Sequence, residues 1–272
     1  MSQTAQTARE PRVPVYLSAI LRRLLGWLPA VIFAGGVVGI WEIWVRAFDV
    51  QRWLLPPPSI IAREIWDSRA LLTEHAWITL QEILIGFGLA ACVGVLLAIG
   101  IAYSKTLERS IYPFVIGSQM IPMITIAPLL LVWVGPQMTS KIIVVALISF
   151  FPIVVNLVDG LKSTDTDMVN MFRTLGASRW QIFTKLQMPN SLPYLLSGLK
   201  IAIVVAVIGA VIGEWVGATG GLGWLMRLSA PQFLTARVFA AIVVLTVMGI
   251  ALFAVVGVVE RWLLRHYSRA SQ

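Results

Sequence analysis

Residues 159–200 read DGLKSTDTDMVNMFRTLGASRWQIFTKLQMPNSLPYLLSGLK. This charged segment separates two strongly apolar runs, residues 142–158 and 201–217. A plain connector between two membrane helices needs neither this length nor these charges. The segment is therefore expected to have structure and a function of its own.

The first half of this segment predicts a short amphipathic helix. Apolar residues recur at helical spacing from Met168 to Leu175. Thr164 or Asp165 can cap the start of the helix. Gly176 occupies the position of a left-handed residue that closes a helix, so the chain is expected to turn there.

The second half predicts another short helix, with a capping box formed by Ser178 and Gln181. Pro189 is expected to stop it. Its apolar residues are Trp180, Ile182, Phe183 and Leu186. The two helices would each present one apolar face among Lys and Arg residues. They are expected either to lie on the lipid surface or to dock onto a soluble partner, and docking is favoured.

The composition indicates a polytopic membrane protein. Of 272 residues, 58% are hydrophobic and only 12% are charged, and the mean hydropathy is +0.84. The net charge of +8 does not indicate a nucleic-acid partner, because the basic residues punctuate apolar segments and form no patch. The single cysteine, Cys92, lies in an apolar run and excludes an intrachain disulfide.

Six apolar runs are long enough to cross the ~30 Å hydrocarbon core as helices. They are residues 27–45, 78–102, 111–134, 142–158, 201–217 and 238–259. With the N-terminus inside, the cytoplasmic segments hold 14 Lys and Arg residues and the outer segments hold 7. This bias predicts an all-α membrane protein with six transmembrane helices and both termini in the cytoplasm.

These runs predict the organisation of the chain. It comprises a cytoplasmic tail (1–26), an uncleaved first transmembrane helix (27–47), an outer loop with an amphipathic helix (48–75), a core of five transmembrane helices (76–260) and a cytoplasmic C-terminal tail (261–272). The core includes the cytoplasmic loop 159–200. In the outer loop, Ser59 is expected to cap the amphipathic helix.

Two runs carry small residues at four-residue spacing, which lets helix backbones approach closely. These residues are Gly86, Ala90, Gly94 and Ala98 in one run, and Ala202, Ala206 and Ala210 in the other. They are expected mainly to pack helices within the chain. The alternative is that part of this small-residue surface forms the contact between two copies of the chain.

Seven residues are candidates for a solute path. Proline breaks in run 111–134 would free carbonyls along a path, which selects Ser118, Gln119 and Pro122. Acids in or beside apolar runs face a cavity or a partner unless they lie at the interface. These acids are Glu42, Glu82 and Glu214. Trp215 can stack on a flat ring or anchor the interface.

The sequence contains no energy source of its own. Residues 160–164, Gly-Leu-Lys-Ser-Thr, lack the upstream glycine and the Gly-Lys pair of a nucleotide-binding loop. His75 and His266 are far apart and predict no metal site, and no nucleophile–base pair indicates an enzyme. A self-contained secondary transporter or channel is the alternative, but no internal repeat supports it.

Gly176, followed after nine residues by Leu186, Gln187, Met188 and Pro189, resembles the second half of the EAA loop of bacterial ABC-importer permeases, Gly-x9-Ile-x-Leu-Pro. Residues 170–172 read Asn-Met-Phe where the family has Glu-Ala-Ala, so no role of the family's glutamate is carried over. Further segments are similar to the nitrate/sulfonate/taurine branch of these permeases: Leu55–Ser59, Ile121–Pro122, Ala127–Pro128 and Gly221–Met226.

The resemblance implies a type I ABC-importer permease fold in the bacterial inner membrane. It also implies a second permease copy, two ABC ATPase subunits that bind ATP and magnesium, and an extracytoplasmic solute-binding protein, with no cofactor in this chain. The expected ATPase-coupling residues are Met171, Phe172, Arg173, Leu175, Gly176, Ala177, Arg179, Trp180 and Pro189.

The cargo is predicted from two observations. Residues 213–218 and 221–226 are more similar to hydroxymethylpyrimidine and riboflavin permeases than to the rest of the branch. No Lys or Arg lies in the middle of an apolar run, which disfavours a strongly anionic solute. We therefore expect a heterocyclic vitamin or vitamin precursor, with alkanesulfonate, taurine or nitrate as the alternative.

Overall fold

The computed structural model describes residues 15–268, and their side chains from 28 to 265. The chain divides into two compact units, Met1–Ile60 and Ile61–Gln272, each of which is described by itself. The helices are α1 (Val15–Ala47), α2 (Pro58–Asp67), α3 (Arg69–Tyr103), α4 (Lys105–Ser118), α5 (Met123–Val134), α6 (Met138–Lys162), α7 (Thr166–Thr174), α8 (Arg179–Ile182), α9 (Met188–Gly217), α10 (Leu222–Ser229) and α11 (Thr235–Ser268). A π-helical turn (Phe183–Gln187) joins α8 to α9, and a 3-10 turn (Ala230–Gln232) follows α10.

Five helical stretches within residues 15–268 are long and apolar enough to cross a membrane: Leu28–Ala47, Arg69–Tyr103, Met138–Lys162, Arg179–Gly217 and Thr235–Arg265. Helices α4 and α5 pass the same test only together, and they are bent by 101° at their junction. Counting this bent pair as one span gives six. The predicted break of the third run is therefore confirmed, and it lies just before Pro122, which precedes the first residue of α5.

In the first unit, which includes the first three residues of α2, a carboxylate accepts hydrogen bonds at the start of this helix. The helix begins at Pro58, so the prediction that Ser59 is its cap is wrong. Instead, the Ser59 N–H and O–H groups donate to the Glu42 carboxylate at 3.0 and 2.7 Å, and Arg46 Nε donates to it at 2.7 Å. An anion at this position satisfies free N–H groups and complements the helix dipole, so Glu42 can supply the capping acceptor that was expected from Ser59.

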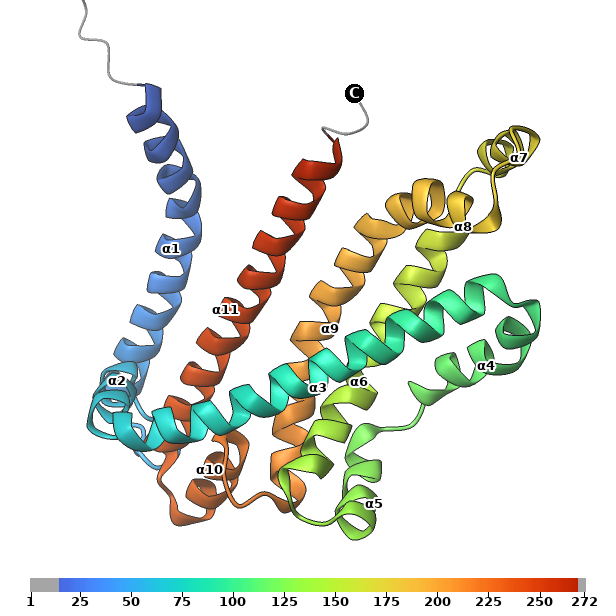
Figure 1. Ribbon diagram of the computed structural model, residues 1–272. Coiled ribbons are helices and arrows are strands. Elements are labelled where there is room, and N and C mark those ends of the chain that lie inside the picture. The colour runs from blue at the N-terminus through green and yellow to red at the C-terminus, as the bar shows by residue number, and fades with distance from the viewer. Residues whose placement is uncertain (1–14, 269–272) are drawn as a thin grey trace, which may run out of the picture. The chain divides into compact units, whose positions relative to one another are not determined.

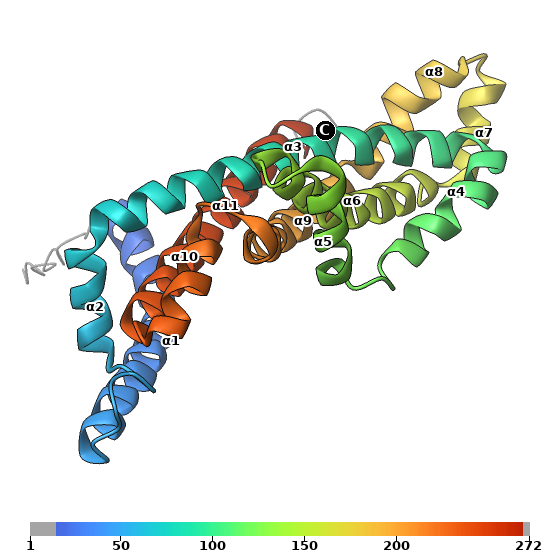
Figure 2. The same cartoon turned by 90° about the horizontal axis from the view of Figure 1, so that it is seen from below.

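In the second unit, α6 packs along both α3 and α9 (Figures 1 and 2). The predicted small residues make this approach possible. A Cβ atom on Gly94 of α3 would lie 3.2 Å from Ile153 Cγ2 of α6. On α9, Gly209 is a further small residue that is not among the predicted ones, and a Cβ atom there would lie 2.7 Å from Ile148 Cγ2 of α6. Ala90, Ala98, Ala202, Ala206 and Ala210 are buried. The expectation that these residues pack helices within the chain is confirmed.

Two predicted boundaries differ from the structure. Helix α3 begins at Arg69, nine residues before the apolar run 78–102 that predicts it, so the helix extends into the segment 48–75. Pro189 does not stop the second predicted short helix of segment 159–200, because it lies in the first turn of α9. The π-helical turn before it widens the backbone, and Met188 N–H bonds to Phe183 O. This wider turn accommodates a proline ring that would clash in a regular α-helix.

Different short helices lie at the two ends of the second unit (Figure 1). Helices α7 and α8 lie at the same end as the C-terminal end of α11, and α10 lies at the opposite end. The predicted tails 1–26 and 261–272 include Arg9, Arg12 and Arg269, which lie outside the described residues. Helix α1 already begins at Val15.

Candidate coupling surface and buried acid cluster

Helix α7 starts and ends as the sequence predicts. The Asp165 side chain caps it by accepting a 2.8 Å hydrogen bond from Asp167 N–H. At the other end Gly176 has φ = +79°, and the Gly176 and Ala177 N–H groups donate to Arg173 O and Phe172 O at 3.0 and 2.9 Å. This is a Schellman closure, which requires the left-handed conformation that glycine adopts without strain.

Helix α8 starts with the predicted capping box. Gln181 N–H donates to Ser178 Oγ at 3.3 Å, and Ser178 N–H donates to Gln181 Oε1 at 2.7 Å. Two otherwise free N–H groups are thereby satisfied. A left-handed glycine and a capping box, only two residues apart, fix the turn between α7 and α8.

Side chains of neighbouring helices also hold this segment in place. Tyr103, the last residue of α3, hydrogen-bonds Gln187, and its ring lies edge-on to Phe183 at a centroid distance of 5.5 Å. Asn190 Nδ2 donates to Ser163 Oγ at 3.2 Å. These contacts connect the π-helical turn that follows α8 to the end of α3, and the start of α9 to the end of α6.

The predicted coupling residues form an exposed apolar surface at the turn. Leu175 is 77% exposed and Trp180 is 70% exposed, and Met171 is also exposed. Phe172 and Ala177 are half-buried beside them. Residues of this size rarely remain uncovered outside the membrane, so this surface indicates either a protein partner or lipid.

A basic groove of about 390 Å³ adjoins this apolar surface. Arg173 and Arg179 line it together with Lys105 from α4, which is not among the predicted coupling residues. Within residues 28–265, no acid lies within 4.0 Å of these three cations. Lys105 escapes prediction because it lies about seventy residues earlier in the sequence and reaches the groove only through the α3–α4 junction.

The predicted path residues fall in different parts of the chain. Ser118, Gln119 and Pro122 lie together at the α4–α5 break, where Gln119 and Pro122 are exposed. Trp215 is 48% exposed. Glu42 belongs to the first unit, where Arg46 and Ser59 bind it.

Glu82 and Glu214 meet in a buried group of polar residues, which we name the acid cluster: His75, Thr79, Glu82, Lys141 and Glu214. Glu214 is fully buried and Glu82 is 2% exposed. The carboxyl groups of these two residues hydrogen-bond each other. Neither acid is exposed at the surface of this unit; both side chains are buried within the protein.

Three members of the acid cluster are absent from the predicted site. Lys141 lies inside α6 and is buried. The sequence did not select it, because α6 begins at Met138, before the apolar run 142–158 that predicts this helix. His75 and Thr79 lie one helical turn apart on the buried face of α3. The four-residue spacing of His75 and Thr79 in a long helix was the sequence signal that could have identified this pair.

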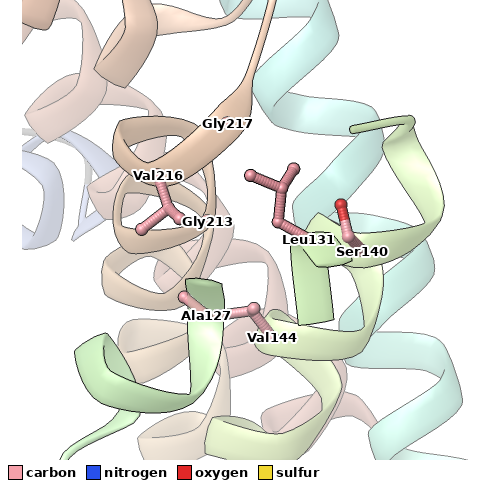
Figure 3. Close-up of a pocket in the computed structure, with 7 residues that line it drawn as sticks. All are labelled: Ala127, Leu131, Ser140, Val144, Gly213, Val216 and Gly217. Atoms are coloured by element: carbon pink, nitrogen blue, oxygen red, sulfur yellow. The ribbon is translucent and has the colours of Figure 1, made fainter. Parts of the chain in front are cut away.

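A small crevice lies beside this cluster. Leu131 of α5 and Ser140 of α6 face the last turns of α9 across a crevice of about 10 Å³, lined also by Gly213 (Figure 3). Such a volume holds about one water molecule. A cargo molecule does not fit there. Among residues 15–268, no group of three His, Cys, Asp or Glu side chains could hold a metal ion.

Comparison with known proteins agrees with this arrangement. Residues 90–265 match the family model described as binding-protein-dependent transport system inner membrane component. The chain is 41% identical over 226 residues to the formylaminopyrimidine transport permease protein ThiX of Halalkalibacterium halodurans, covering 83% of this chain and 90% of that one. It is 34% identical over 227 residues to the riboflavin transport system permease protein RibX of Chloroflexus aurantiacus, covering 83% and 85%.

A solved structure shares the fold. An inward-facing form of the MetNI methionine ABC transporter aligns with a TM-score of 0.61 at 20% identity, covering 74% of this chain and 98% of that chain. A helical bundle with an exposed, braced turn at one end thus occurs in a chain whose sequence matches the permease family over most of its length. The protein belongs to the family of binding-protein-dependent transport system inner membrane components, the membrane permease subunits of ABC importers.

Proposed function

We propose that α7, α8 and the turn between them form the surface through which an ABC ATPase drives this permease. The observation that carries the proposal is the exposure of Leu175 and Trp180 on a turn that is fixed by its own hydrogen bonds. A rigid apolar projection suits a groove in a partner, because little conformational entropy is lost on docking. Its contacts with α3 and α9 give the partner a mechanical connection to the membrane helices.

The basic groove supplies the polar part of the same interface. Lys105, Arg173 and Arg179 would pair with acidic side chains of the ATPase. The charge bias supports a cytoplasmic location for this end of the chain, where ATP is available. We further propose an assembly of two permease copies, two ATPase subunits and one extracytoplasmic solute-binding protein.

The cargo we propose is a flat heterocyclic vitamin or vitamin precursor, such as riboflavin or an aminopyrimidine. The similarity to the formylaminopyrimidine and riboflavin permeases supports this assignment. The aliphatic sulfonate permease SsuC of Bacillus subtilis and the taurine permease TauC of Escherichia coli are each 29% identical to the chain. Alkanesulfonate, taurine or nitrate therefore remains the second candidate.

Docking is tested by co-purification of the ATPase with tagged permease. Trp180→Ala should weaken the complex at least about tenfold, since an aromatic anchor at an interface centre typically contributes this much. The matched control is Trp133→Ala in α5, because Trp133 is 72% exposed but lies far along the chain from the turn. Equal recovery of ATPase with both variants would overturn the proposed docking role.

The cargo is tested separately with the solute-binding protein of the same importer. Calorimetric titration with an aminopyrimidine, riboflavin and taurine should show binding of one of the two heterocycles. Tight binding of taurine alone would overturn the cargo and leave the docking proposal intact.

A further inference from the structure

The acid cluster contains two buried carboxyl groups that bond each other, and this arrangement fixes the position of a proton. Two carboxylates in contact inside a protein repel strongly, so a hydrogen bond between them requires one proton. Glu82 and Glu214 form such a bond. The remaining donors around the pair identify the residue that carries the proton.

Both oxygens of Glu214 already accept hydrogen bonds. Thr79 O–H donates to Oε1 at 2.6 Å, and Gly223 N–H donates to Oε2 at 2.5 Å. By contrast, Oε2 of Glu82 has no hydrogen-bond partner in the described part of the chain. Glu214 is therefore the ionised acceptor, and Glu82 is the neutral acid that donates.

Lys141 completes the charge balance without pairing directly with either acid. Its Nζ donates to Pro136 O at 2.5 Å and to Gln137 O at 3.0 Å. It remains close enough to Glu82 and Glu214 to interact with both electrostatically. One carboxylate, one neutral acid and one ammonium give a buried cluster with no net charge, as a low dielectric favours.

The cluster holds the start of α10. Gly221 N–H donates to His75 Nδ1 at 3.1 Å, and Leu222 N–H donates to Thr79 Oγ1 at 2.8 Å. With the Gly223 bond, three successive N–H groups at the N-terminus of α10 are satisfied by side chains of α3 and α9. Separation of α10 from these helices would leave buried donors and a buried carboxylate unpaired, which is costly.

We propose that Glu82 is a positioning residue for transport. As a neutral acid it donates to Glu214 and holds this carboxylate against the N-terminus of α10. Helices α3, α9 and α10 then move as one body when the permease changes conformation. The proposal concerns the end opposite α7 and α8, and it does not depend on how the ATPase docks.

Infrared spectroscopy of the full permease–ATPase complex locates the proton. A protonated carboxylic acid has its own carbonyl absorption band, separate from that of a carboxylate. The wild type should show this band at neutral pH, and Glu82→Gln should remove it. The control Glu108→Gln, at an exposed ion pair with Lys162, should leave it unchanged. A band that persists in Glu82→Gln would overturn the assignment of the proton.

Transport and the mobility of α10 test the positioning role. Glu82→Ala should lower the uptake rate about 10-fold or more, because a bond to a buried charge is lost, and Glu82→Gln should restore most of it, since its amide still donates to Glu214. A spin label on Leu228→Cys, exposed on α10, in a Cys92→Ser background should become more mobile in Glu82→Ala and not in Glu82→Gln. An immobile label and full uptake in Glu82→Ala, or no rescue by Gln, would contradict the proposal.

Discussion

Gly86 of α3 lies so close to Val145 of α6 that a methyl group on the glycine would come within 2.6 Å of Val145 Cβ. Real Cβ atoms do not approach other atoms this closely. The same methyl group would lie 3.0 Å from Ile142 O, which is backbone and cannot rotate away. The packing of α3 on α6 therefore depends on the absence of a side chain at residue 86.

Gly86→Ala should destabilise the permease by about 1–3 kcal/mol, because the overpacked contact forces the two helices apart. The control is Gly88→Ala in the same helix, where nothing lies within 4 Å of the added atom. That variant should be neutral or more stable by up to about 1 kcal/mol, from helix propensity. Thermal unfolding in detergent measures both. Equal melting temperatures would show that the helices are not in the predicted contact.

Gly176 should tolerate asparagine but not valine. Its φ of +79° is accessible to asparagine and is a strained conformation for a β-branched residue. Gly176→Val should cost about 1–3 kcal/mol locally and reduce recovery of the ATPase with the permease, whereas Gly176→Asn should retain most of it. No atom lies within 4 Å of an added Cβ, so steric collision does not confuse the comparison. Equal ATPase recovery with both variants would argue against the left-handed turn.

Ser178→Ala should open α8 without affecting the membrane helices. It removes the side-chain acceptor of the capping box and should cost about 0.5–2 kcal/mol at the start of this helix. Hydrogen–deuterium exchange should increase for the amides of residues 179–182 and remain unchanged in α6. Increased exchange throughout the chain would instead indicate general unfolding.

The basic groove should make ATPase association depend on salt. Replacing Lys105 with Gln should weaken association at low ionic strength and reduce its salt dependence, because exposed charges mainly affect association rates and are screened by ions. Lys185→Gln is the control, since Lys185 lies on the neighbouring turn but does not line the groove. Association rates over a salt series measure the effect. Identical slopes for the two variants would remove Lys105 from the interface.

The structure of helices α7 and α8 was predictable because its signals are local. Asp165, Gly176 and the Ser178–Gln181 pair act on the backbone within four residues, so sequence spacing alone reveals them. The small residues of α3 and α9 were predictable for the same reason. The prediction that Pro189 stops a helix was wrong, because a π-helical turn can accommodate a proline and leaves no clear mark in the sequence.

The acid cluster was only half predictable. Glu82 and Glu214 are conspicuous as acids in apolar runs, but their meeting depends on the pairing of α3 with α9, across about 130 residues. His75 and Lys141 lie at helix starts that apolar runs do not define. The three N–H groups that the cluster satisfies belong to residues 221–223, whose side chains give no sign of the contact.

Uptake into proteoliposomes tests the central claim that a separate ATPase subunit drives this permease through α7 and α8. Vesicles with the permease, its ATPase and ATP inside, and with the binding protein and a labelled aminopyrimidine or riboflavin outside, should accumulate solute. Omitting the ATPase should abolish uptake, and Trp180→Ala should reduce it while Trp133→Ala does not. Accumulation by the permease alone, with no ATPase present, would contradict the account.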